Sequence, residues 1–371
     1  MSKSTFLEKL LDGAGAEWVP LQKLVKTLTA AAKIQRGKYE TVGDIPVIDQ
    51  GADFIAGYTD KGNKATELGQ YVIFGDHTEH VKYVDFIFAQ GADGLKILQP
   101  ISSNPKYIYY AFQTFYTKEF QYKRHWSKAK DTEIPIPCPE NPEKSLAIQA
   151  EIVRILDTFT ELTAELTAEL TARKKQYNYY RDQLLTFKDG EVEWKTLGEV
   201  YKFQYGMGNT IPTLGGEYPI YGSNGIVGAH NEFNSEDSPV IGHIGAYAGI
   251  VNWGKGKHFV TYNGVICRLI SERVSSKYAY YQLLKQDFNS MAKSASHPFV
   301  SYAELNKVLI PIPSPSEQVR IVAILDQFDT LTHSISEGLP REIELRQKQY
   351  EYYRDLLLNF PKSEPQTEGV A

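Results

Sequence analysis

The chain has 371 residues, of which 42% are hydrophobic, and a formal net charge of −5 at pH 7. This length suffices for two or three domains with buried cores, and the composition excludes a disordered chain. No apolar run reaches membrane-spanning length and the first residues lack a signal-peptide pattern, so we expect a cytoplasmic protein. Cys138 and Cys267 lack metal-binding spacing, which favours reduced thiols over a structural zinc site.

The acidic net charge argues at first sight against a nucleic-acid partner, but the charge is unevenly distributed. Residues 20–133 carry 15 Lys and Arg against 13 Asp and Glu, and residues 195–309 carry 10 against 8. The acidic excess therefore lies in the segments predicted to be helical. The two intervening segments are mildly basic, which is compatible with nucleic-acid binding.

An internal repeat divides the chain into two similar halves. The pair EW at 17–18 returns at 193–194, and the segment IPIP at 134–137 returns at 310–313, both at an offset of 176 residues. We expect these prolines to end regular structure where the chain leaves each half. EIVRILD at 151–157 returns as RIVAILD at 320–326, and KQYNYYRD at 175–182 returns as KQYEYYRD at 348–355.

A helix end also precedes each half, because Leu10-Leu11 before the first EW pair echoes Leu184-Leu185 before the second. A helix end before each half and a helix after it predict a cyclic arrangement about a pseudo-two-fold axis. The long helices would then lie side by side and antiparallel.

Between the shared segments, short apolar runs separated by Gly, Asn and Asp predict strands and turns. These runs lie at 71–74, 86–88, 240–241 and 265–267. The segments YIYY at 107–110 and YAYY at 278–281 predict a helix that returns the chain to IPIP. The related segments IPV at 45–47 and YPI at 218–220 indicate that both halves share a fold. The predicted class is α+β, with two similar mixed α/β domains separated by a pair of long antiparallel helices.

Residues 146–185 predict one uninterrupted helix, since apolar residues recur in steps of three and four with no Gly or Pro. It contains an exact tandem of TAEL, formed by Thr163, Ala164, Glu165, Leu166, Thr167, Ala168, Glu169 and Leu170. Four residues lengthen a helix by about 6 Å and keep its apolar stripe nearly aligned, so each copy can adjust the length. An accidental repeat in an ordinary helix is the alternative. In the C-terminal helix, Gly338 and Pro340 predict a break or a kink.

Catalytic motifs are missing from the sequence. It has no (D/N/S)PP(Y/F) motif of adenine methyltransferases, no complete glycine-rich cofactor loop and no Walker motif. His77 and His80 have HxxH spacing, but without a Cys or a recognised metal-ligand pattern this spacing favours polar or DNA-facing histidines over a metal site. We therefore expect the chain alone to be inert and to hold no metal.

The two-copy layout, the IPIP segments, the KQYxYYRD helix ends and the TAEL tandem together resemble the specificity subunit of type I restriction-modification enzymes. The similarity is greatest to the subfamily that carries TAEL repeats in its central helix. It covers the shared segments, including PENPEKSLAIQAEIVRILD at 139–157 and EGLPREIELRQKQYEYYRDLL at 337–357. Parts of the intervening segments, such as YPIYGSNGIVGAHNEF from 218 onwards, also resemble stretches of its recognition domains.

The resemblance implies two target recognition domains, each of which reads one half of a bipartite DNA sequence, and helices that set the unread spacer. It also implies two modification (methyltransferase) subunits docked on the helices, restriction subunits that complete the nuclease, and double-stranded DNA as substrate. S-adenosylmethionine, ATP and Mg would be bound by the partner subunits, and no cofactor by this one. A non-catalytic coiled-coil scaffold that joins two protein-binding domains is the alternative. The domains implied are 1–137 (first recognition domain), 138–190 (central helix), 191–313 (second recognition domain), 314–360 (C-terminal helix) and 361–371 (flexible tail).

Candidate DNA contacts are drawn from basic and polar loop residues, because Lys and Arg bind phosphates or guanine and amides bind adenine. The strongest basic and aromatic cluster spans residues 122–130, and residues 293–299 are its counterpart. The candidates are Asp76, His77, Lys82, Lys96, Lys123, Arg124, His125, Lys128, Ser223, Asn224, His243, Lys257, Lys293 and His297. The helix-end tyrosines at 177, 179, 180, 350, 352 and 353 are expected to pack between helices or against a partner rather than to stack on bases.

Overall fold

The computed structural model describes residues 15–28, 30, 32–62, 65–91, 94–291, 298–334 and 336–361. The helix end expected at 10–11 and nearly all of the expected tail lie outside these residues. The chain forms two compact units, and the boundaries between them fall after Glu165 and after Ile343. The first unit therefore takes the start of the chain together with its last helix, and the second takes the residues between the two boundaries. No helix in the described ranges is long and apolar enough to cross a membrane.

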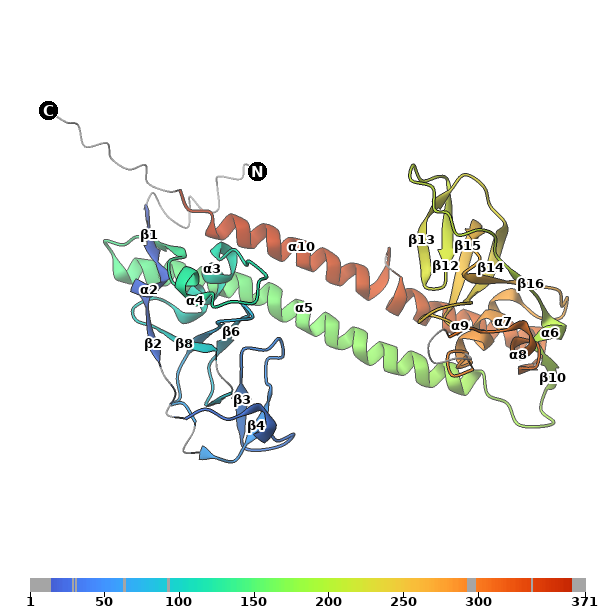
Figure 1. Cartoon of the computed structure of the whole chain (residues 1–371), viewed down its shortest axis with the longest axis horizontal. Coiled ribbons are helices and arrows are strands. Elements are labelled where there is room, and N and C mark those ends of the chain that lie inside the picture. The colour runs from blue at the N-terminus through green and yellow to red at the C-terminus, as the bar shows by residue number, and fades with distance from the viewer. Residues whose placement is uncertain are drawn as a thin grey trace. The chain divides into compact units, whose positions relative to one another are not determined.

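Within the described residues, the first unit contains three small sheets and several short helices in addition to its parts of the long helices α5 (Pro142–Leu184) and α10 (Gly338–Leu358) (Figure 1). A two-stranded sheet pairs β1 (Ala16–Pro20) with β9 (Glu133–Pro137). A four-stranded antiparallel sheet has the order β2 (Val25–Leu28), β8 (Leu95–Pro100), β5 (Tyr71–Gly75), β6 (Val81–Val84). A three-stranded sheet has the order β4 (Gly57–Thr59), β3 (Ile45–Ile48), β7 (Ala89–Gln90). The helical elements are α2 (Leu21–Leu24), η1 (Arg36–Lys38), α3 (Pro105–Phe115) and α4 (Trp126–Ala129).

The second unit repeats this design with one larger sheet. Its two-stranded sheet pairs β10 (Glu193–Thr196) with β17 (Leu309–Ile312). Its six-stranded sheet has the order β11 (Tyr201–Tyr205), β16 (Gly264–Leu269), β14 (Ser235–Gly242), β15 (Val251–Val260), β12 (Tyr218–Gly222), β13 (Gly225–His230). Its shorter helices are α6 (Leu197–Val200), α7 (Ser276–Lys285) and α8 (Tyr302–Leu305).

Both units have the same strand order once β6 and β7 are taken together as the equivalent of β15. β7 pairs in parallel with β3, just as the end of β15 pairs in parallel with β12. This confirms that the two halves share an α+β fold. The strand predicted at 86–88 is wrong, because these residues form the interruption between β6 and β7 where the second unit has one continuous strand. The strands predicted at 71–74, 240–241 and 265–267 and the helices predicted at 107–110 and 278–281 are confirmed.

Pro135 and Pro311 lie inside the strands β9 and β17, so the expectation that the prolines end regular structure is wrong for these two. It holds for the second proline of each segment, because Pro137 is the last residue of β9 and Pro313 directly follows β17. Trp18 lies opposite Pro135 and Trp194 lies opposite Pro311 in the two pairs. Proline is tolerated here because both strands of a two-stranded sheet are edges, where a backbone N–H can be missing without loss of a ladder bond. The segments therefore still fix where the chain leaves each half.

Buried tyrosines of α3 and α7 fasten each unit to the helix that follows its IPIP strand. In the first unit, the Tyr107 hydroxyl donates to the Pro135 carbonyl at 2.6 Å, and the Tyr110 hydroxyl donates to Asp157 Oδ1 at 2.6 Å. The side-chain carbonyl of Gln149 accepts the N–H of Asn104 at 2.8 Å and so holds the start of α3. Strand β9, helix α3 and the helix that follows β9 are therefore tied together at one place.

The second unit repeats the same three bonds with the equivalent residues. The Tyr278 hydroxyl donates to the Pro311 carbonyl at 2.9 Å, and the Tyr281 hydroxyl donates to Asp326 Oδ1. Gln318 Oε1 accepts the N–H of Ser275 at 2.8 Å. The internal repeat of the sequence is therefore a repeat of specific hydrogen bonds.

The long helix predicted at 146–185 is α5 (Pro142–Leu184), 43 residues without a break. In the first unit, Phe159 of α5 stacks on Tyr353 of the last helix with ring centres 5.1 Å apart. The second unit has the equivalent pair: Tyr180, the counterpart of Tyr353, stacks on Phe328, the counterpart of Phe159, with ring centres 5.7 Å apart. These pairs confirm helix packing as the use of Tyr180 and Tyr353. Tyr179 and Tyr352 are 62% and 49% exposed.

The C-terminal helix is interrupted, as the sequence predicts, into α9 (Pro315–His333) and α10 (Gly338–Leu358). Gly338 begins α10 with a left-handed backbone (φ +71°). A Cβ atom there would lie 2.4 Å from the carbonyl oxygen of Thr330. Only glycine combines this φ with such a close approach to the preceding helix.

We expect Gly338→Ala to destabilise the second unit much more than Gly190→Ala. Gly190 has a similar backbone (φ +86°), but its Cβ would meet no atom within 4 Å. Both variants carry the left-handed penalty of about 1–2 kcal/mol, and only Gly338→Ala adds a clash with backbone. The thermal unfolding midpoint of the second unit measures this difference in stability. Equal falls in the midpoint for both variants would contradict the close approach of α9 to Gly338.

Candidate nucleic-acid interface

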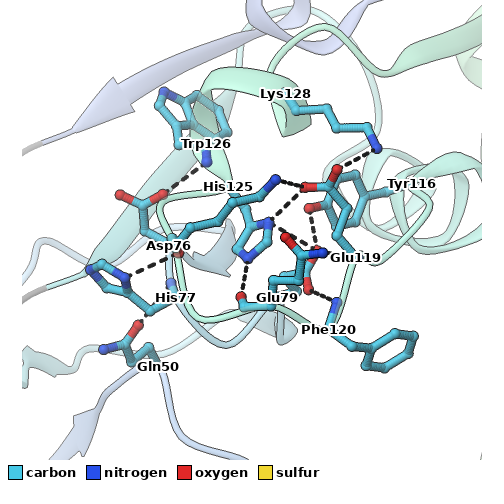
Figure 2. A network of polar contacts seen from close by, with 12 residues as sticks. Gln50, Asp76, His77, Glu79, Tyr116, Glu119, Phe120, His125, Trp126 and Lys128 are labelled. Carbon is cyan, nitrogen blue, oxygen red and sulfur yellow. Dashed lines mark hydrogen bonds and ion pairs between the residues drawn. The ribbon is translucent and has the colours of Figure 1, made fainter.

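A buried carboxylate organises the surface loop that contains the basic cluster of the first unit. Glu79 lies in the turn from β5 to β6, has a left-handed backbone (φ +56°) and is 2% exposed. Its carboxylate accepts the Tyr116 hydroxyl at 2.6 Å and the backbone N–H groups of Glu119 and Phe120 at 2.9 and 2.8 Å (Figure 2). Because three donors converge on it, Glu79 fixes the path of the chain after α3.

His125 holds the other end of the same loop and is fully buried. Its Nδ1 lies 3.3 Å from Glu79 Oε1 and 3.2 Å from Glu119 Oε2, and its Nε2 lies 2.7 Å from the Gln121 carbonyl oxygen. Asp76 Oδ1 accepts the backbone N–H of Trp126 at 2.8 Å and caps the start of α4 (Figure 2). The loop between Tyr116 and Trp126 is thus tied to the β5–β6 turn at both ends.

The charges in this network are fixed by their hydrogen bonds. Burial by itself raises the pKa of Glu79, but the bonds from Tyr116, Glu119 and Phe120, with the nearby His125, outweigh it and leave the pKa below its usual value. On the surface, hydrogen bonds from Lys123 and Lys128 lower the pKa of Glu119 to about 2. Both carboxylates are therefore ionised at neutral pH.

A pocket of about 290 Å³ lies beside this network and is lined by residues 49–53 together with Arg36, Tyr39, Ala56 and Thr78. Lys82 supports the 49–53 loop, because its ammonium donates to the carbonyl oxygens of Asp49 and Asp53 at 2.8 and 2.6 Å. Gln50 Oε1 accepts the backbone N–H of His77 at 3.2 Å, which joins the pocket to the β5–β6 turn.

In the second unit, the candidates within the described residues lie on two hairpins, β12–β13 and β14–β15. Ser223 and Asn224 form the two-residue turn between β12 and β13, followed by Gly225 with φ +79°. Asn224 is exposed and Ser223 half-buried. Lys257 lies on β15, is exposed, and places its ammonium 4.6 Å from the centre of the Phe233 ring.

Four of the predicted DNA contacts are corrected by the structure, because their side chains are buried and hold loops in place. Asp76, Lys82, His125 and His243 are 5%, 6%, 0% and 6% exposed. His243 Nδ1 lies 2.9 Å from the Val300 carbonyl oxygen, and burial lowers its pKa. A buried side chain already bonded to backbone cannot reach a base edge without unfolding its loop. Lys293 and His297 lie outside the described residues.

The other candidates reach the surface. Lys123, Arg124, Lys128, Asn224 and Lys257 are exposed, and His77, Lys96 and Ser223 are half-buried. The structure brings His77, Lys123 and Arg124 onto one loop region, because His77 Nδ1 lies 3.1 Å from the Lys123 carbonyl oxygen. Glu79 and Phe120 were not among the predicted site residues, because no periodicity in the sequence reveals the left-handed backbone of either residue or the hydrogen bonds to the Glu79 carboxylate.

We expect Glu79→Gln to destabilise the first unit at pH 7 by about 1–3 kcal/mol, since amide nitrogen cannot accept the bonds that the carboxylate accepts. The folded pKa of Glu79 is lowered, so its stabilisation is present above the unfolded pKa of about 4.3 and disappears as pH falls through the folded pKa. The thermal unfolding midpoints of wild type and variant should therefore converge as pH falls towards 4 and below. The exposed Glu40→Gln serves as control, and a difference that does not depend on pH would contradict the role of the charge.

The comparisons with known proteins agree with the duplicated design. Residues 17–173 and 190–345 each match the family described as type I restriction modification DNA specificity domain. The chain is 42% identical to the EcoR124I/EcoR124II specificity subunit of Escherichia coli over 98% of this chain and 99% of that one. It is 35% identical to the EcoprrI specificity subunit of Escherichia coli over 91% and 93% of the two chains.

Solved structures share the fold. A type I restriction-modification S subunit from M. genitalium aligns with a TM-score of 0.66 at 18% identity, over 95% of this chain and 98% of that one. A chain from a study of type I restriction-modification complex assembly aligns with a TM-score of 0.54 at 15% identity, over 93% and 97% of the two chains. The chain belongs to the type I restriction-modification DNA specificity family and is a DNA sequence-specificity subunit, the non-catalytic component of a type I restriction enzyme.

Proposed function

We propose that each unit reads one half of a bipartite duplex target through the exposed loop residues. The observation that carries this proposal is that both units have one strand order and one set of fastening bonds but different loop residues. A common scaffold with different surfaces suits two reading heads with different sequences. Arg and Lys can bind guanine or phosphate and Asn can bind adenine, so each unit has suitable donors. The residues assigned to DNA contact are His77, Lys96, Lys123, Arg124, Lys128, Ser223, Asn224 and Lys257.

We further propose that α5 sets the number of unread base pairs between the half-sites. Within the TAEL tandem, Leu166 and Leu170 are half-buried, whereas Ala164, Glu165 and Ala168 are exposed. One copy lengthens the helix by about 6 Å, against roughly 3.4 Å for each base pair, so the number of copies would change the spacer by one or two base pairs. The helix is continuous through the tandem, and an ion pair between Glu169 and Arg173 at 2.6 Å supports its exposed side.

The partners of this subunit are proposed from its family. Two modification subunits would dock on α5 and α10, where Tyr179 and Tyr352 are exposed at equivalent positions of the repeat. Restriction subunits would join them in the cytoplasm. S-adenosylmethionine, ATP and Mg would be bound by these partners. Large exposed aromatic side chains at equivalent places suit a repeated protein contact.

The test is to map adenine methylation in a host that expresses this chain with its modification subunit. We expect marks in two short sequences separated by a fixed number of unspecified bases. Methylation of one continuous sequence, or its absence in a host with an active modification subunit, would contradict the proposal.

We expect Asn224→Ala to relax one position in the half-site read by the second unit, because a lost bidentate contact costs about 1–3 kcal/mol of discrimination. The other half-site and the spacer should stay unchanged in the methylation map. Asn178→Ala, an exposed residue on α5, is the matched control and should leave both half-sites unchanged. Relaxation of both half-sites by Asn224→Ala would contradict the assignment of one half-site to each unit.

A further inference from the structure

The loop of residues 117–124, here called the aromatic loop, exposes two large side chains that the assigned contacts do not use. Phe120 is 88% exposed and Tyr122 is 91% exposed. Tyr122 lies parallel to the His77 ring, with ring centres 5.3 Å apart. Phe120 makes no ring contact with any residue that the structure describes, and its ring points away from the polar network (Figure 2).

Phe120 is held in a backbone conformation that disfavours it. Its φ is +55°, in the left-handed region where a bulky side chain costs about 1–2 kcal/mol. The bond from its N–H to the buried Glu79 keeps it there at 2.8 Å, and Glu79 itself has φ +56°. Glycine would fit this position without strain, so the fold has no use for an exposed phenyl ring here. Strain of this kind is concentrated at functional sites.

The surroundings of Phe120 favour DNA as the molecule that it contacts. Residues 117–130 contain five Lys and Arg, at 118, 123, 124, 128 and 130, against one acidic residue, Glu119. The centres of protein interfaces are depleted of such charges, whereas DNA interfaces are strongly positive. Apolar side chains flanked by cations also insert between bases or contact them in DNA grooves.

We propose that Phe120 contacts the bases of the first half-site directly, while Arg124 and Lys123 bind the flanking phosphates. In this arrangement Glu79 is a positioning residue, which acts by holding the backbone of Phe120. The inference rests on the proposed function and adds to it an apolar contact of the first unit.

The deciding variant is Phe120→Gly, in the full chain assembled with its modification subunits. Glycine preserves the left-handed backbone and removes only the ring, so the first unit should be as stable as in wild type or more stable. The probes are the duplex defined by methylation mapping and an unrelated duplex. We expect affinity for the mapped duplex to fall at least tenfold, with unchanged affinity for the unrelated duplex and an unchanged slope of log affinity against log salt.

Two further variants separate the parts of the contact. Arg124→Gln should lower the affinity for both duplexes and reduce the slope of log affinity against log salt by about 1, as expected for one lost phosphate contact. Glu79→Gln should lower the affinity for the mapped duplex in the wild-type background and have a smaller effect in the Phe120→Gly background, because part of its effect acts through the backbone of Phe120. Leu68→Ala, at a 73% exposed apolar residue of the first unit that has no assigned contact, is the control and should leave duplex affinity unchanged.

Several results would overturn the proposal. If Phe120→Gly bound the mapped duplex as tightly as wild type does, the ring would not contact DNA. Loss of modification subunits from the assembled Phe120→Gly complex, measured by its mass in solution, would assign the ring to a protein contact instead. If the wild-type complex did not prefer the mapped duplex, this proposal and the proposed function would both fail, whereas preference without a Phe120 effect would overturn this proposal alone.

Discussion

A buried tyrosine hydroxyl bonded to a helix aspartate is the interaction on which each unit depends. Tyr110 donates to Asp157 and Tyr281 donates to Asp326, at equivalent positions of the repeat. Burial and the adjacent carboxylate raise the pKa of both tyrosines, so each hydroxyl keeps its proton and remains a donor. Asp157 also pairs with Lys106 at 2.7 Å, and the Tyr110 hydroxyl also lies 3.4 Å from Thr160 Oγ1. Loss of either aspartate would remove the acceptor of a buried tyrosine hydroxyl, and an unsatisfied buried donor costs more than the bond itself contributes. The two units are therefore fastened to their helices in one way, whatever their loops contain.

The residues that make this fastening recur in both halves of the chain, whereas the surface loops of the two halves differ. The aspartate, the tyrosine and the proline carbonyl lie in segments that recur in both halves of the chain. The loops between the strands make no contribution to these bonds and can differ, as the β5–β6 turn and its equivalent, the β14–β15 loop, do. A subunit that must recognise two different DNA sequences requires this arrangement, because new loops can then be accommodated without loss of the helix contacts.

Much of the fold was predictable because it depends on local patterns and on the repeat. The continuous α5, the break before α10 and the shared fold follow from the spacing of apolar residues, from Gly338 and from the recurring segments. The IPIP strands were not predictable in this way, since their pairing with β1 and β10 joins residues more than 100 positions apart. No local rule shows that an edge position would accept proline.

The candidate site was less predictable than the fold. Lys82 and His125 have side chains typical of DNA contacts, yet both are buried, because carbonyl and carboxylate oxygens from distant loops surround them. Whether a cation faces solvent or supports a loop depends on tertiary contacts and not on its neighbours in sequence. Phe120 was missed for the opposite reason, since an apolar residue in a polar loop is usually incidental, and only its left-handed backbone marks it.

The central claim is that two independent reading units are separated by a helix whose length determines the spacer. Its most direct test is to delete one TAEL copy, Thr167 to Leu170, and to map adenine methylation by the complex assembled with its modification subunits. The account predicts the same two half-sites with a spacer shorter by one or two base pairs, since about 6 Å of helix is removed. An unchanged spacer in an active complex, or altered half-site sequences, would contradict it.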